Sequence, residues 1–165
     1  MKRIVLLSFF FMSVVLLQAQ TFRAERENDI REYSRQMEKL ENAYLSHNIR
    51  ALREGVKQLL QIMQDEMIRS AQDLAAVKQA MDGGRGSGNM KLKLQVKKNR
   101  LDIMKYIRNR VISFDISTIY DYSQREVAGF RSGLNHFKVL MEYNLDPTKA
   151  ITHINLGVKT LSTPQ

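Results

Sequence analysis

Apolar residues recur every three or four positions along most of this chain, which is the spacing of one face of an α-helix. The sequence shows no alternation of strand and helix patterns of the kind that a parallel sheet requires. The pattern therefore predicts an all-α fold, an antiparallel helical bundle of about four amphipathic helices plus a short C-terminal helix. The first two helices are indicated by Ile30, Tyr33, Met37, Leu40, Tyr44, then Ile49, Leu52, Val56, Leu59 and Met63.

A glycine-rich run from Gly83 to Asn89 divides these apolar segments into two halves. Such a run stops a helix and forms a flexible connector. We expect one helical hairpin over 22–82, a linker over 83–89 and further helices over 90–157. The run matches neither a P-loop nor a dinucleotide-binding loop, because Asn89 and Met90 follow Gly88 where those motifs require other residues.

Three local patterns place the turns of the bundle. The apolar phase breaks between Tyr44 and Ile49. A tight turn at 46–48 is the preferred interpretation, and a continuous helix in which Leu45 joins the apolar face is the alternative. Residues 114–122 predict a break, and Ser123 with Glu126 then has the spacing of a capping box at the next helix start. Pro147 is expected to open the short last helix.

The N-terminus has the layout of a secretory signal peptide. Lys2 and Arg3 precede fourteen uncharged residues from Ile4 to Leu17, and Gln-Ala-Gln follows. We therefore expect a signal peptide over 1–20, a single helical domain over 21–165 and a periplasmic or secreted location. An uncleaved membrane anchor is the alternative. The chain has no cysteine, so its stability must come from packing.

Nearly all of the net charge lies in one segment. Residues 83–114 hold nine basic residues and one acidic residue, which gives this segment a charge of +8. The whole chain carries a formal charge of +9. Most of these cations fall within one half of a helical wheel, which is typical either of a solvated helix face or of an anion-binding surface. The candidate anion-binding residues are Lys93, Lys97, Arg100 and Arg108, the best-aligned stripe, together with Lys91, Lys98 and Lys105.

The sequence offers no catalytic or cofactor motif. His47, His136 and His153 have no glutamate three residues before them, so the di-iron pattern of helical bundles is absent. We therefore predict no catalytic residue, no metal ligand and no cofactor.

Three classes of function are consistent with these features. The first is an exported, non-enzymatic interaction protein whose basic helix binds an anionic envelope partner, either a lipid, an acidic polysaccharide or an acidic protein. The second is a periplasmic holdase-like chaperone, and the third is a cofactor-binding bundle. Export disfavours nucleic acid as a partner, and self-association into a homo-oligomer is compatible with all three.

Overall fold

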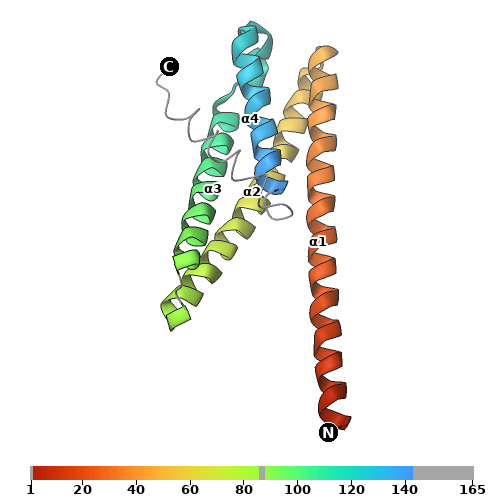
Figure 1. Cartoon of the computed structure of the whole chain (residues 1–165). Coiled ribbons are helices and arrows are strands. Elements are labelled where there is room, and N and C mark those ends of the chain that lie inside the picture. The colour runs from red at the N-terminus through yellow and green to blue at the C-terminus, as the bar shows by residue number, and fades with distance from the viewer. Residues whose placement is uncertain (1, 86–87, 143–165) are drawn as a thin grey trace.

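The computed structural model describes the backbone of residues 2–85 and 88–142 and the side chains of 23–83 and 88–142. Within these ranges the chain is all-helical, with four long helices packed against each other (Figure 1). The predicted short helix after Pro147 lies outside the described residues. The long helices are α1 (Lys2–Leu45), α2 (Ile49–Ala80), α3 (Gly88–Ser113) and α4 (Gln124–Glu142).

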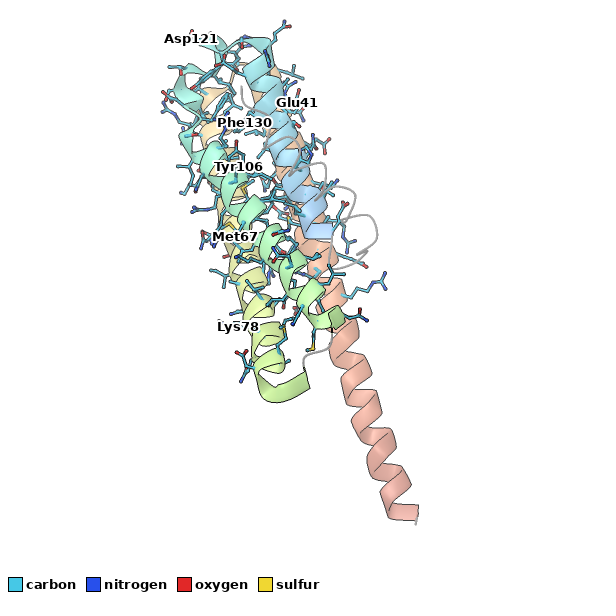
Figure 2. The ribbon with its side chains drawn as sticks, turned by 60° about the vertical axis from the view of Figure 1, so that its left-hand side comes forward. Glu41, Met67, Lys78, Tyr106, Asp121 and Phe130 are labelled. Carbon is cyan, nitrogen blue, oxygen red and sulfur yellow. The ribbon has the colours of Figure 1, made fainter. Side chains whose placement is uncertain are left out.

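Helix α1 begins much earlier than the expected start at residue 22. It runs without interruption from Lys2, so the predicted signal segment continues directly into the first helix of the bundle. The apolar residues of that segment favour helix, and no glycine or proline interrupts them. The N-terminal part of α1 extends beyond the other three helices (Figures 1 and 2). Cleavage after residue 20 stays a prediction.

The tight turn between α1 and α2 is confirmed. The side chain of Asn48 caps α2 by accepting a hydrogen bond from the Ala51 N–H at 3.0 Å. His47 has a φ of +54°, which lets the chain reverse over three residues. The His47 ring stacks on Tyr120 with 4.4 Å between ring centroids, and this contact holds the turn against the segment that connects α3 to α4.

The glycine run is more helical than expected. A π-helix, η1 (Met81–Arg85), follows α2, and α3 already begins at Gly88. Gly88 and Asn89, which were expected to belong to the linker, therefore lie inside α3. The wider π turn is compatible with glycine, which has no Cβ to restrict its backbone.

The break between α3 and α4 and its capping box are both confirmed. A 3₁₀-helix, η2 (Ile116–Asp121), fills the break. Ser123 donates its backbone N–H to Glu126 Oε2 at 2.8 Å, and the Glu126 N–H donates to Ser123 Oγ at 3.3 Å. Two donors at the start of α4 are thereby satisfied within the chain.

One hydrophobic core joins the four helices. Helix α2 packs along both α1 and α3, and α4 packs against α3 and α1. Tyr33 and Phe137 are fully buried and stack with 5.8 Å between ring centroids, while the Tyr33 hydroxyl donates to the Leu134 carbonyl at 3.1 Å. The predicted seam of α2 is part of this core, since Leu52, Val56, Leu59 and Met63 are all buried.

Gly55 lies where α2 packs tightly against α1. A Cβ built at this position would lie 3.1 Å from Leu40 Cδ1, and Gly55 itself is buried. By contrast, a Cβ at Gly129 in α4 would have no neighbour within 4 Å. These two glycines therefore differ in what a larger side chain would meet.

Replacing Gly55 with leucine is expected to lower the free energy of unfolding by about 1–3 kcal/mol, because the added side chain overpacks the α1–α2 contact. Gly129→Ala is the control, and it should raise stability by about 0.5–1 kcal/mol through helix propensity alone. Urea denaturation of both variants measures these changes. Equal stability of Gly55→Leu and the wild type would mean that the two helices are not in close contact there.

Candidate functional site

The structure separates the predicted anion-binding residues into outward and inward groups. Lys91, Lys93, Lys98 and Lys105 are exposed on α3. Lys97 and Arg108 are half-buried, and Arg100 is only 1% exposed. The basic helix is therefore not one uniform charged face.

The stripe of Lys93, Lys97, Arg100 and Arg108 does not form a continuous exposed surface. Arg100 lies in the core, and Lys97 Nζ lies 3.5 Å from Asp73 Oδ2 on α2. Leu101 and Met104, which share this half of the wheel, are buried as well. The buried side of α3 thus overlaps the half that the sequence indicated as basic, and Arg100 is not accessible to a partner at the surface.

A different row of cations faces outward. Lys91, Lys98 and Lys105 are separated by seven residues, so they lie on nearly the same side of the helix. Ile112, the next position in this row, is 51% exposed, and the neighbouring Tyr106 is 47% exposed. We call the four residues Lys91, Lys98, Lys105 and Ile112 the outer row. It spans about 30 Å at a rise of 1.5 Å per residue.

No lysine of the outer row forms an ion pair with a described carboxylate. The cations in the ion pairs among the described residues are Lys97 and several arginines. None of these pairs involves Lys91, Lys98 or Lys105. Asp102 is the one acidic residue of α3. The outer row therefore keeps a net positive charge that the fold does not neutralise.

Arg100 belongs to a buried charge cluster where all four helices meet. Glu66 of α2 is fully buried and binds Arg26 of α1 and Arg100 of α3, the latter through an Nη2–Oε1 contact of 2.7 Å. Arg100 also donates Nη1 to Ser70 Oγ and Nε to the Leu140 carbonyl of α4, both at 2.8 Å. We call Arg26, Glu66, Ser70 and Arg100 the charge cluster.

Burial and pairing act in opposite directions on Arg100. Burial lowers the pKa of Arg100 from its ordinary value, because the charged form loses its water, and the Glu66 carboxylate counters this effect. An arginine nevertheless keeps its proton at any physiological pH. A buried carboxylate between two guanidinium groups fixes the relative positions of the helices that carry them, since any separation would leave a buried charge unpaired.

Two further ion pairs flank the charge cluster at its edge. Arg69 Nη1 lies 2.7 Å from Asp29 Oδ2, joining α2 to α1, and Lys97 joins α3 to Asp73 of α2 as described above. Their side chains are partly exposed, so each contributes less than the buried contacts do. Together they continue the charged contacts toward the surface.

The charge cluster was not predicted from the sequence, although a periodic signal for it exists. Met63 is followed on the buried face by Glu66 and Ser70, which continue the three-and-four spacing with polar residues. Arg26 precedes the buried Tyr33 by seven residues in the same way. A search restricted to apolar residues follows Met67 and Ala71 instead and passes over these positions.

Histidine and acidic side chains are the groups that hold metal ions in helical bundles. Among the described residues, no group of three histidine, aspartate or glutamate residues is placed to hold a metal ion. His47 stacks in the first turn and His136 contacts Ser132 of its own helix, while His153 lies outside the described residues. Across the residues whose side chains are described, no helix is both long and apolar enough to cross a bilayer.

Comparison with known proteins gives no relative: no protein-family model, no curated protein and no solved structure matches this chain. The function must therefore be inferred from the chemistry of the described surfaces.

Proposed function

We propose that this chain is an exported, non-enzymatic interaction protein that binds an anionic lipid surface of the cell envelope through the outer row of α3. The observation that carries the proposal is the set of three exposed lysines, Lys91, Lys98 and Lys105, on one side of a helix and without an acidic partner in the described residues.

Export is supported by the N-terminal sequence and by the shape of α1. The charged start and the apolar run of a signal peptide lie in the part of α1 that extends beyond the other helices (Figure 1). In this proposal, residues 21–165 form the mature domain. Its helices form two antiparallel hairpins, joined near the glycine run.

The apolar neighbours of the lysines favour a lipid surface over a fully hydrated polyanion. Leu92 and Ile112 are 66% and 51% exposed, and Tyr106 is also exposed. A helix that presents lysines beside apolar and aromatic side chains can place the latter at the headgroup boundary. Each lysine near an anionic membrane contributes about 1 kcal/mol, so three lysines bind weakly alone. Two copies bound to one membrane would strengthen the attachment by avidity.

Changing Lys91, Lys98 and Lys105 together to glutamine is expected to lower binding to anionic vesicles by about a hundredfold, because about 3 kcal/mol of attraction is removed. Co-sedimentation with phosphatidylglycerol-containing vesicles measures the binding, and phosphatidylcholine vesicles show the background. Binding of the wild type should also weaken as salt is raised from 50 to 300 mM, since surface charges are screened.

A charge-matched variant provides the control. Lys39, Arg50 and Arg125 are exposed and lie on the other helices, so their replacement by glutamine removes the same charge from a different surface. The control should retain most of the binding. If both triple variants lose binding equally, only the net charge matters and the outer row is not the site. If the wild type binds no anionic vesicle but prevents aggregation of an unfolded protein, the chaperone function replaces this proposal.

A further inference from the structure

A separate pocket lies between α2, the end of α3 and η2. It is a shallow depression, widely open to solvent, with a volume of about 520 Å³, which is within the range of small-molecule sites. Val56, Leu60, Phe114 and Ile116 give it an apolar floor. Val56 and Ile116 are buried, while Leu60 and Phe114 are half-buried, so the floor is partly open to a ligand. This pocket includes none of the outer-row lysines.

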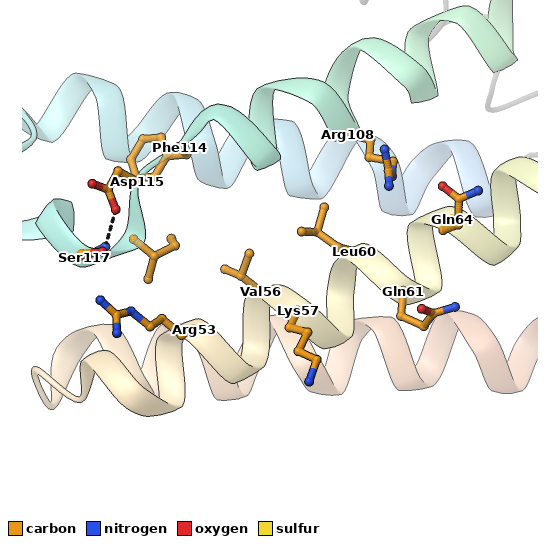
Figure 3. A pocket seen from close by; sticks show the side chains of 11 residues that line it. Arg53, Val56, Lys57, Leu60, Gln61, Gln64, Arg108, Phe114, Asp115 and Ser117 are labelled. Atoms are coloured by element: carbon orange, nitrogen blue, oxygen red, sulfur yellow. Dashed lines mark hydrogen bonds between the residues drawn. The ribbon is translucent and has the colours of Figure 1, made fainter.

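One end of the pocket carries an arginine that the fold does not pair. Figure 3 shows Arg108 pointing from α3 toward α2, at the end of the pocket where Gln64 lies. No described group accepts a hydrogen bond from the Arg108 side chain, and its Nε is shielded from solvent without a partner. Because guanidinium donors are costly to leave unpaired when shielded, this end favours an incoming acceptor.

The other end of the pocket also has a cation, but an acid offsets it. Arg53 lies near Asp115, whose carboxylate accepts a hydrogen bond from the Ser117 N–H at 2.9 Å (Figure 3). The hydrogen bonds from Ser117, and to a smaller degree the charge of Arg53, lower the pKa of Asp115. Asp115 is therefore ionised at neutral pH and offsets Arg53, whereas Arg108 forms no ion pair with a described carboxylate. Lys57, which is exposed, also lines the pocket and adds to its positive charge.

We infer that this pocket binds a small anionic amphiphile, with a carboxylate or phosphate at Arg108 and Gln64 and an apolar body over Val56, Leu60 and Phe114. The planar guanidinium suits both acids because it donates two parallel hydrogen bonds. The glutamine amide supplies a further donor. The apolar floor selects against a free inorganic anion. This site goes beyond the proposed membrane contact, because none of the outer-row lysines lines it and it takes a single molecule.

Octyl phosphate and octanoate are suitable probes below their micelle concentrations. 1-Octanol, which has only the apolar tail, and inorganic phosphate, which has only the anionic group, are the control ligands. The experiments use the purified protein in the form in which it accumulates in cells. Isothermal titration calorimetry gives the affinities, and changes in amide chemical shifts show where the probe lies. We expect at least one of the two acidic probes to bind at least tenfold more tightly than either 1-octanol or inorganic phosphate. Its shifts should fall at residues 56–64 and 108–117. The probe that binds more tightly shows whether the pocket prefers a phosphate or a carboxylate group.

Arg108→Gln should weaken octyl phosphate and octanoate at least tenfold, whereas Arg53→Gln should weaken them less. Gln64→Glu places a repelling charge at the same end and should act like Arg108→Gln, which keeps the test valid if one variant does not fold. The triple glutamine variant of Lys91, Lys98 and Lys105 should bind both probes with the affinity of the wild type. A failure of this pocket inference can therefore be distinguished from a failure of the proposed vesicle binding. The inference would be overturned if 1-octanol bound as tightly as the acidic probes, or if Arg108→Gln bound the probes with the affinity of the wild type. Amide shifts confined to the outer row would also overturn it.

Discussion

Replacing Glu66 with alanine is expected to lower the free energy of unfolding by about 3–5 kcal/mol, because two buried arginines lose the carboxylate between them. Glu66 is fully buried and contacts both Arg26 and Arg100. The cost arises because the desolvation of two buried guanidinium groups is no longer offset by the Glu66 carboxylate. Chemical denaturation followed by helical circular dichroism gives the value.

The neighbouring Asp65 supplies the control, since it is exposed and makes only a side-chain contact with Gln61. Asp65→Ala should change stability by about 0.5 kcal/mol or less. A Glu66→Ala variant as stable as Asp65→Ala would show that the three side chains are not buried together in solution.

Replacing Phe137 with alanine is expected to cost about 3–5 kcal/mol, because it leaves a cavity at the contact of α4 with α1. The ring is fully buried and stacks on Tyr33, whose hydroxyl also binds the Leu134 carbonyl of α4. Thermal or urea unfolding measures the loss, and the near-ultraviolet signal of the tyrosines should change because the stacked partner of Tyr33 is removed.

Leu92→Ala is the comparison for this prediction. Leu92 is 66% exposed on α3, so its truncation should cost little. If Phe137→Ala and Leu92→Ala unfold at the same denaturant concentration, α4 does not pack on α1 through this ring.

The elements that could be predicted from the sequence are those whose signals are local. The apolar seam of α2, the turn capped by Asn48, the 114–122 break and the Ser123–Glu126 capping box each depend on residues within a few positions of one another. Helix propensity and side-chain caps act at this range, so the sequence pattern and the structure agree.

Helix α3 could be predicted only as a helix, because its inward face is set by other helices. Leu92 has the correct spacing for the core but is exposed, while Arg100 is buried. Arg100 can be buried because Glu66, Ser70 and the Leu140 carbonyl surround it, and these partners lie 30 to 40 residues away in the chain. Hydrophobic periodicity carries no information about such partners.

The same limitation explains the outcome for the candidate site. The count of charges pointed to α3. A helical wheel drawn for one helix alone could not separate Lys98 and Lys105, which are exposed, from Lys97 and Arg100, which contact α2. The stripe that was best aligned in sequence includes the most buried cation of the helix. The outer row follows only once the position of α2 is known.

The central claim is that the positive charges of α3 are divided between an outer row and inward contacts, and urea denaturation of two charge-matched triple variants tests it most directly. One variant changes Lys91, Lys98 and Lys105 to glutamine, and the other changes Lys97, Arg100 and Arg108. We predict that the first keeps the free energy of unfolding of the wild type within about 0.5 kcal/mol, and that the second loses about 3–5 kcal/mol. Equal losses in the two variants, or a larger loss in the first, would contradict this division of α3.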